Sequence, residues 1–301
     1  MTRLTPDWID TKIPATPTNI KARQITDADV EGVVRLLAHG FGQTRSQAFW
    51  ERAFAILKRR QSPEGFPRYG YVLESDGILA GVLILIFSTH WEGGRAKVLC
   101  NVSSWYVDPA FRGYASMLAS LAQRYKNVTV FNISASSHTH ATLMTSGFKV
   151  YNGGVLAAIP AMSQNAHPAL VIDARHEPDA SFDPHDWELL LEHADYGCTS
   201  LWCVTPQRAY PFVFRSRLVK KILPSAQLIY CPNLEDFARF ARPLGLYLAR
   251  SARFLVLLDT NGPLTGVRGK YFPGFLPKFF YGQEPPRLGD LSYTEIAMFG
   301  I

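Results

Sequence analysis

An arginine and a glycine at the end of a predicted strand are the residues of this chain whose types and spacing best suit anion binding. The strand is predicted over Lys97–Val107, which is apolar, β-branched and aromatic, and Met117–Ala122 has helical spacing. Backbone N–H groups at a helix N-terminus lack intrahelical partners, and the helix dipole favours negative charge there. Arg112 adds a cation, and Gly113 lets the backbone approach an anion closely. We therefore predict a phosphate or pyrophosphate site at this junction. An ordinary junction with a surface arginine is the alternative.

The segment Val107-Asp-Pro-Ala-Phe-Arg-Gly-Tyr-Ala-Ser116 resembles the acyl-coenzyme A pyrophosphate loop of the GNAT superfamily of N-acetyltransferases. That loop usually has Arg or Gln, two residues, Gly, one residue, and then Gly or Ala. The matching positions here are Arg112, Ala115 and Met117, so a methionine that can narrow the pyrophosphate seat replaces the second small residue. The resemblance implies these cofactor-binding residues: Trp105, Tyr106, Val107, Arg112, Gly113, Tyr114, Ala115, Ser116 and Asn132. Tyr114 as a surface residue and Asn132 as simple strand polarity remain alternatives.

The elements around the junction also resemble that family, over about residues 18–160. Strand, two helices, three strands, helix, strand, helix, strand is the predicted order, which implies an α/β fold with a mixed sheet. Three local signals set its boundaries: a capping box at Thr26–Asp29, a hairpin turn at Ser75–Ile78, and a C-terminal helix cap at Gly147. The predicted strands are Ile20–Ile25, Tyr69–Glu74, Leu79–Phe87, Lys97–Val107, Asn127–Ser134 and one from Lys149. The resemblance also implies that the strands Lys97–Val107 and Asn127–Ser134 splay apart, with the thioester in the gap.

The remainder of the chain predicts a second unit, which gives domains at 1–160 and 161–301. After a linker or extended crossover at Ala161–Asp183, a helix is predicted from Pro184 and another from Asn233, where Pro243 should kink or interrupt it. Strands are predicted at Ser200–Val204 (or a continued helix), Ala209–Arg215, Ala226–Cys231 and Arg253–Asp259. The order favours a degenerate GNAT-like copy that lacks the phosphate loop. An unrelated α+β cap is the alternative.

The aromatic segment Lys270–Tyr281 stands apart, because Pro273, Gly274 and Pro277 rule out a regular helix. It is either a lid or a substrate wall that buries aliphatic or sugar surface, or a core-covering loop whose aromatics fill the join between the halves. We favour the loop.

Direct transfer of an acyl group to an amine needs a proton acceptor, a donor to the thioester carbonyl, and an acid for the leaving thiolate. The resemblance places the carbonyl donor on backbone N–H groups near Tyr106 and Val107. The family's usual acidic tyrosine is absent, since Leu143 and Met144 occupy its place, and Lys97–Trp105 holds no carboxylate. The candidate catalytic residues are therefore Tyr106, His138 and His140. A polar loop and helix N-terminus is the alternative role of the two histidines.

The predicted function is transfer of an acetyl or other acyl group from acyl-coenzyme A to the amine or hydroxyl of a small-molecule acceptor. The alternative is a non-catalytic protein with the same fold that binds or senses acyl-coenzyme A, which the missing tyrosine and carboxylate favour. Transfer from an aminoacyl-tRNA is disfavoured, because the net charge of +6 is too small for tracking a long phosphate backbone.

Composition predicts no further partner class. The 301 residues contain no apolar run long enough to span a membrane, and Met1–Trp8 lacks the apolar core of a signal peptide. The four cysteines fit no zinc spacing and are expected to be free thiols in a cytoplasmic protein. We expect no nucleic acid, membrane or metal partner, and the oligomeric state is left open.

Overall fold

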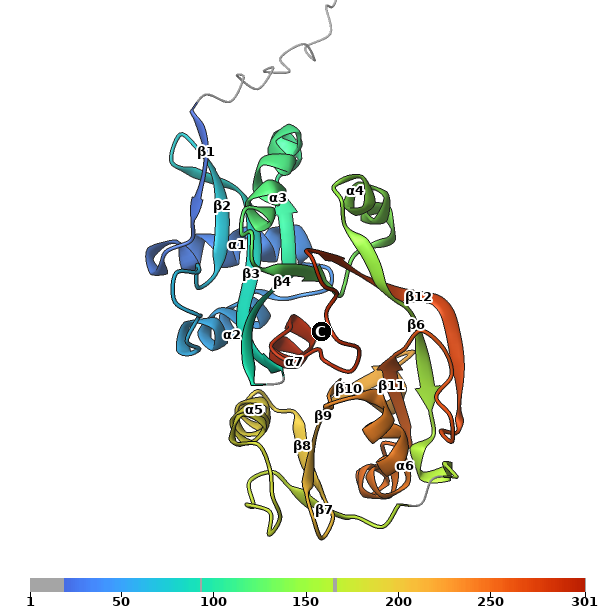
Figure 1. Cartoon of the computed structure of the whole chain (residues 1–301). Coiled ribbons are helices and arrows are strands. Elements are labelled where there is room, and N and C mark those ends of the chain that lie inside the picture. Colours follow the sequence, from blue (N-terminus) through green and yellow to red (C-terminus); the bar gives the residue numbers. More distant parts are fainter. Residues whose placement is uncertain (1–18, 93, 165–166, 301) are drawn as a thin grey trace, which may run out of the picture.

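The computed structural model describes residues 19–92, 94–164 and 167–300. Within these ranges the strands form one twelve-stranded sheet in the order β1-β2-β3-β4-β5-β12-β6-β11-β10-β9-β8-β7 (Figure 1). The strands are β1 (Ile20–Gln24), β2 (Gly70–Ser75), β3 (Ile78–Glu92), β4 (Arg95–Val107), β5 (Thr129–Asn132), β6 (Lys149–Ala158), β7 (Leu170–Asp173), β8 (Thr199–Val204), β9 (Ala209–Val219), β10 (Leu223–Tyr230), β11 (Leu255–Asp259) and β12 (Gly269–Tyr281). The helices are α1 (Val30–Phe41), α2 (Gln47–Arg59), α3 (Ala115–Gln123), α4 (His140–Thr145), α5 (Pro184–Asp195), α6 (Leu234–Ala249) and α7 (Glu295–Phe299). Together they form the mixed α/β fold expected from the sequence.

The local signals in the first half are confirmed. The Thr26 amide donates to the Asp29 carboxylate at 2.8 Å, which closes the capping box. Asp76 and Gly77 both have positive φ (51° and 83°), as a tight hairpin turn requires. Gly147 ends α4 at φ 87°, and its amide donates to the Met144 carbonyl at 3.0 Å. The strands and helices from β1 to β6 also follow one another in the predicted order.

The two parts of the sheet repeat one order of elements. Read from one edge, the sheet runs β1 to β5 and then β12; read from the other, it runs β7 to β11 and then β6. In each part a helix joins two parallel strands, as β4–α3–β5 and as β10–α6–β11. The last strand of each half therefore lies in the sheet of the other half. The division at residue 160 and the degenerate second copy stay predictions.

Pro243 does not interrupt its helix, so this part of the prediction is wrong, whereas the alternative of a kink stays a prediction. Helix α6 runs unbroken from Leu234 to Ala249 with Pro243 inside it. Proline in a helix interior costs about 3 kcal/mol. Buried side chains anchor α6 on both sides of the proline, among them Phe237 and Phe240 before it and Leu244 and Leu248 after it. Their packing outweighs the local cost.

Two predicted loops contain strands instead. The segment Lys270–Tyr281 is neither a lid nor a loop, because it forms most of β12, which pairs with β5 on one side and β6 on the other. Its pairing with β6 is interrupted between Pro273 and Lys278, so Pro277 lies at a position that has no partner residue on β6. The expected linker Ala161–Asp183 contains β7, which forms the far edge of the sheet.

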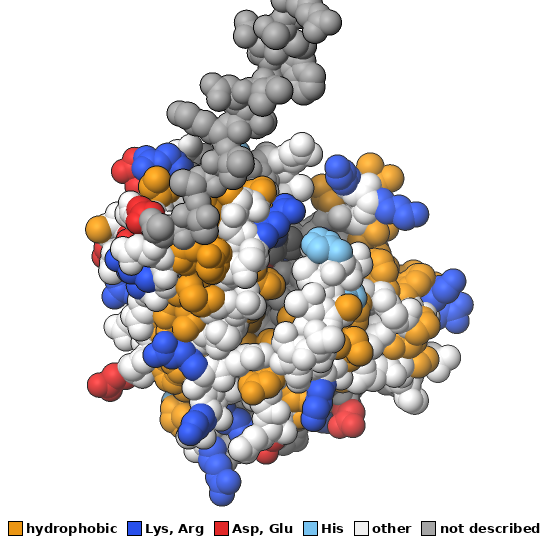
Figure 2. Space-filling model, turned by 90° about the horizontal axis from the view of Figure 1, so that it is seen from above, with side chains coloured by type: hydrophobic (Ala, Val, Ile, Leu, Met, Phe, Trp, Pro, Cys, Tyr) orange, Lys and Arg blue, Asp and Glu red, His pale blue; other side chains and the backbone are white. Residues whose placement is uncertain are grey.

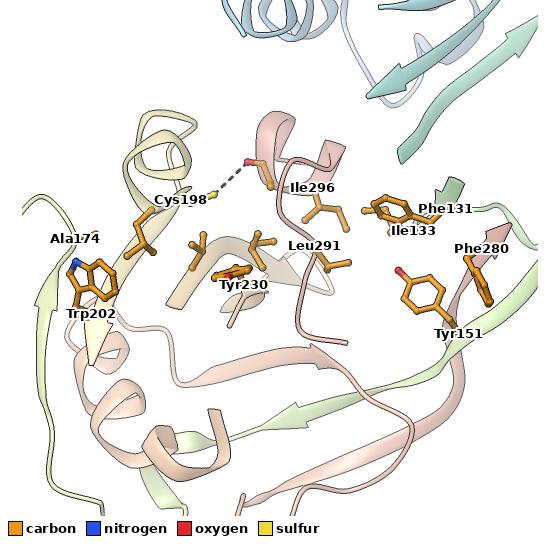
Figure 3. Packing of buried hydrophobic residues seen from close by; sticks show 14 of the residues in the cluster. Phe131, Ile133, Tyr151, Ala174, Cys198, Trp202, Tyr230, Phe280, Leu291 and Ile296 are labelled. Atoms are coloured by element: carbon orange, nitrogen blue, oxygen red, sulfur yellow. Dashed lines mark hydrogen bonds between the residues drawn. The ribbon is translucent and has the colours of Figure 1, made fainter. Parts of the chain in front are cut away.

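The C-terminal segment packs between the two halves. Figure 3 shows Leu291 and Ile296 in a buried cluster, with Phe131 of β5 on one side and Tyr230 of β10 and Trp202 of β8 on the other. Figure 1 accordingly places α7 between the two lobes of the molecule. Residues about 160 positions apart in sequence thus meet beside β5.

No described helix is long and apolar enough to cross a membrane. The predicted lack of a signal peptide concerns residues outside the described ranges.

Candidate functional site

The parallel strands β4 and β5 form a fork. They pair at Leu99, Cys100 and Asn101 of β4, and β4 continues to Val107 beside β3 alone. Strand β4 also carries an irregularity, since Leu83 and Leu85 of β3 face Trp105 and Val102. Beyond Asn101, one backbone edge of β4 therefore has no strand partner among the described residues, and unpaired backbone groups of this kind can pair with another extended segment. Figure 2 looks onto this end of the molecule and shows a hollow with Lys or Arg side chains on both sides of it.

The predicted phosphate junction lies beside the fork. Residues Pro109–Tyr114 form a 3-10 turn, which the Asp108 carboxylate caps by accepting from the Ala110 amide at 3.0 Å. The Ala115 amide donates to the Arg112 carbonyl. This N–H group is therefore already hydrogen-bonded within the turn, although the sequence predicted it to be free for an anion. Gly113 is exposed, and apart from its chain neighbours no atom of the described residues lies within 4 Å of the position that a Cβ would occupy. This end of α3 has space in front of it for an anion.

Side chains around the junction keep that space open. Arg112, Ser116 and Tyr114 are exposed, and α3 has no side-chain cap from Tyr114. Met117, the residue that departs from the family pattern, packs against the core between α3 and the sheet. The residues present fit the diphosphate of a coenzyme A.

The predicted residues of β4 point to opposite faces of the sheet. Trp105 and Val107 pack against the core under α3. Tyr106 packs on the α1 side, with its ring 6.1 Å from that of Phe41. A Cβ on Gly40 would lie 2.4 Å from the Tyr106 ring, so the glycine makes room for it. Burial raises the pKa of Tyr106.

The predicted residues at and after the end of β5 lie on the other side of the fork. The Asn132 side chain accepts from the Ser134 amide at 3.0 Å, which orders the turn that leaves β5. His138 is exposed in the Ser137–Thr139 turn. His140 is half-buried, with Nε2 at 3.2 Å from the Ala135 carbonyl and its ring 4.9 Å from that of Phe279. The roles predicted for all of these residues stay predictions.

A carboxylate missed by the sequence analysis lies where β4 and β5 part. Glu295 begins α7 and is 1% exposed. Its amide donates to Asn101 Oδ1 at 3.2 Å, and its Oε1 accepts from the Ser134 hydroxyl at 2.6 Å. Asn101 belongs to the last paired position of β4, and Ser134 follows β5. The C-terminal segment therefore joins both arms of the fork.

The environment of Glu295 favours its neutral form. Burial raises its pKa to about 7, although the Ser134 hydrogen bond and the Arg45 charge act in the opposite direction. Its second oxygen, Oε2, is buried, and no residue in the described ranges bonds to it. Arg45 comes from the connection between α1 and α2 and donates to Ser104 Oγ at 3.3 Å. A carboxyl group with this pKa can exchange a proton near neutral pH.

Contacts along the C-terminal segment hold Glu295 in place. The buried His193 accepts from the Tyr293 amide at 3.1 Å through Nε2, and burial lowers its pKa to about 4, so the ring is neutral. Asp290 lies 3.2 Å from His90 Nδ1. Arg215 of β9 donates to the Ala297 carbonyl at 3.3 Å. The segment is thus anchored from both halves of the molecule.

An acidic cavity of about 890 Å³ lies on another side of the same segment. It is bounded by the end of α2, by Thr89–Trp91 of β3, by α5, and by Asp290 and Tyr293. Six carboxylates line it, against the two guanidinium groups of Arg59 and Arg60: Asp183, Asp186, Glu188, Glu192, Asp195 and Asp290. The field inside favours a cation, in contrast to the net positive charge of the chain. Among the described residues, no group of His, Cys, Asp and Glu is arranged to hold a metal ion.

The fold resembles that of known acetyltransferases. A GCN5-related N-acetyltransferase from Anabaena variabilis matches at a TM-score of 0.56 and 11% identity, over 87% of this chain and 72% of that one. A GCN5-related N-acetyltransferase from Kribbella flavida matches at 0.53 and 13%, over 88% of this chain and 71% of that one. No protein-family model matches the chain, and no curated protein matches its sequence. The similarity in structure confirms the GNAT fold predicted from the sequence.

Proposed function

Since the chain has the fold of the GCN5-related N-acetyltransferases, we propose that it transfers an acyl group from acyl-coenzyme A to an amine of a small molecule. The observation that carries the proposal is the fork, in which β4 loses β5 as a partner after Asn101 while the Arg112 turn lies beside it. A pantetheine arm has two amide groups and can pair with an open strand edge, as peptides do in β-augmentation. Acetyl-coenzyme A or a longer acyl-coenzyme A is the proposed donor.

Different parts of the fork are proposed to bind different parts of acyl-coenzyme A. Arg112 and the start of α3 are proposed to bind the diphosphate, because both supply positive charge at an exposed surface. The open backbone of β4 near Tyr106 and Val107 is proposed to hold the pantetheine arm and the thioester carbonyl, which gains negative charge as the amine attacks. Such donors lower the barrier because they are already oriented before the reaction.

The acceptor is proposed to be an amine because of the acidic cavity. An ammonium ion is attracted to its six carboxylates, and Tyr293 in its lining is only two residues from Glu295 at the fork. Acceptors with hydroxyl groups alone gain less from this field.

Binding of acetyl-coenzyme A to the Arg112→Glu variant tests the proposal. Loss of a charge-assisted hydrogen bond should weaken binding by roughly 1–3 kcal/mol, or about 5- to 150-fold in Kd. Arg175→Glu, an exposed charge reversal beside β7 at the far edge of the sheet, is the matched control and should leave Kd unchanged. Calorimetry measures both variants. Equal affinities of wild type and Arg112→Glu would remove Arg112 from the site.

Turnover separates the enzyme from the acyl-coenzyme A sensor. Release of coenzyme A thiol from acetyl-coenzyme A is followed with a panel of primary amines, including ethanolamine, putrescine and glucosamine. Thiol release above the amine-free background supports transfer. Tight binding without amine-dependent release would support the sensor instead.

A further inference from the structure

The hydroxyl group of Ser134 connects the buried carboxylate of Glu295 to the surface. Ser134 is exposed, and its Oγ donates to Glu295 Oε1 at 2.6 Å. Oε2 of the same carboxylate has no hydrogen-bond partner among the described residues, although leaving a buried oxygen unpaired is unfavourable. The Ser134 hydroxyl can exchange protons with solvent and with the buried carboxyl group. The unpaired Oε2 does not stabilise the fold, so we interpret the arrangement as one for proton transfer.

Two further hydrogen bonds fix this pair where β4 and β5 part. The Glu295 amide donates to Asn101 Oδ1, and the Ser134 amide donates to Asn132 Oδ1. Asn101 faces Phe131 in the last pair between the strands. The hydroxyl group therefore lies beside the gap in which the thioester and the amine are proposed to meet.

We propose that Ser134 and Glu295 form the proton acceptor of the reaction, with the Ser134 hydroxyl as the relay and the Glu295 carboxylate as the base. The inference rests on the proposed acyl transfer. It assigns the missing carboxylate to the C-terminal segment of the chain, which the second half of the molecule holds in place.

The proton step balances as follows from the groups present. The acceptor ammonium gives a proton to Ser134 Oγ while the hydroxyl proton moves to Glu295 Oε1, so serine is unchanged and the carboxyl becomes neutral. The free amine then forms a C–N bond with the thioester carbon, and the C–S bond breaks. The second amine proton passes to the departing thiolate, and Glu295 returns its proton to solvent.

The charged and titratable groups around Glu295 come from several elements. Arg45 acts on it from the α1–α2 connection. The pKa of Tyr151 of β6 is raised mainly by burial, with a smaller contribution from the Glu295 charge. Arg215 and Cys198 bond to the Ala297 carbonyl at the other end of α7. Arg45 is the cation that acts on the carboxylate directly, and its effect is smaller than that of burial. The base is consequently half ionised close to neutral pH.

The pH dependence of kcat tests the relay, with acetyl-coenzyme A and the most active amine of the panel as substrates. Wild type should gain activity as pH rises through about 7. Glu295→Gln should lower kcat by about 100-fold or more and remove this rise. Ser134→Ala should lower kcat and move the rise to higher pH, because the carboxylate loses a donor. Ser134→Thr should restore both, and the exposed Glu177→Gln is the control that should match wild type.

An infrared titration of the carboxyl group gives a readout without turnover. A protonated-carboxyl band should disappear near pH 7 in wild type, be absent in Glu295→Gln, and persist to higher pH in Ser134→Ala. Thermal melting checks that each variant is folded. Active wild type with an unchanged pH profile in both variants, or a carboxyl that titrates only near pH 4–5, would overturn the relay and leave acyl transfer standing. Wild type that releases no thiol with any amine would overturn both.

Discussion

Two carboxylates of the C-terminal segment show how the immediate neighbours of a buried acid decide its charge. Burial acts to raise the pKa of Asp290, but His90, Arg287 and Ser292 outweigh it and hold the pKa well below its usual range. Glu295, five residues later, accepts from the Ser134 hydroxyl and has Arg45 as a nearby cation, but burial dominates and its pKa is about 7. Asp290 is therefore a permanent anion, whereas Glu295 can change charge under physiological conditions.

The raised pKa of Glu295 predicts a pH-dependent stability difference for Glu295→Gln. The folded-state pKa lies above the ordinary value of 4.5, so the carboxyl stabilises the fold at low pH and this contribution is lost as pH rises through about 7. Glutamine cannot ionise. The free energy of unfolding of the variant relative to wild type should therefore rise between pH 5 and pH 8, by up to about 3 kcal/mol. Urea unfolding at several pH values measures it, and a pH-independent difference would contradict the prediction.

At the scale of elements, close contacts between backbones set where the helices lie. Helix α6 approaches the Pro160–Met162 turn so closely that a Cβ on Gly245 would lie 2.1 Å from the Ala161 amide nitrogen. This turn leads out of β6, which lies beside β11 in the sheet. Because Gly245 has no side chain, α6 can pack directly against the Pro160–Met162 turn.

Gly245→Ala should destabilise the protein although alanine is the better helix former. The obstructing atoms belong to backbone and cannot rotate away, so α6 or the turn must shift, at a cost of about 1–3 kcal/mol. Gly262→Ala is the control, because its Cβ position has no atom within 4 Å in the part of the chain that the structure describes, its own chain neighbours apart. Its effect should stay within about 0.5 kcal/mol. Chemical denaturation of both variants measures the difference, and equal stabilities would refute the close contact.

At the scale of the whole molecule, the two halves depend on each other through exchanged strands. Strand β12 lies between β5 and β6, and its Phe279 and Phe280 are buried there. Lys278 of the same strand forms a buried ion pair with Asp259 of β11, with 2.7 Å between Nζ and Oδ1. The sheet that carries the fork is complete only when the end of the chain has returned to it.

A fragment of residues 1–160 should therefore not fold on its own. Without β12, the facing edges of β5 and β6 lack a partner and their buried aromatic contacts are lost. We expect the fragment to lack near-ultraviolet circular dichroism and a sharp urea transition, both of which the full chain should show. A cooperative transition in the fragment would instead support an independent domain that ends at residue 160.

The amino-acid sequence alone determined the local features of this protein. Apolar periodicity, the Thr26–Asp29 cap, the Asp76-Gly77 turn and the Gly147 helix end depend on neighbouring residues, and they predicted the order of elements from β1 to β6. The Arg112-Gly113 junction was found in the same way.

Only the tertiary structure decided which distant segments meet. Nothing local marks Glu295 as more than an acidic residue at the start of a short helix, a place that the helix dipole favours anyway. Its burial, its pKa and its bond to Ser134 arise from contacts across 161 residues of sequence. The strand character of β12 likewise comes from the open edges of β5 and β6, which offer backbone partners that outweigh its prolines and glycine. Pairing between remote backbones and burial between two halves are collective properties, so no short window of sequence contains them.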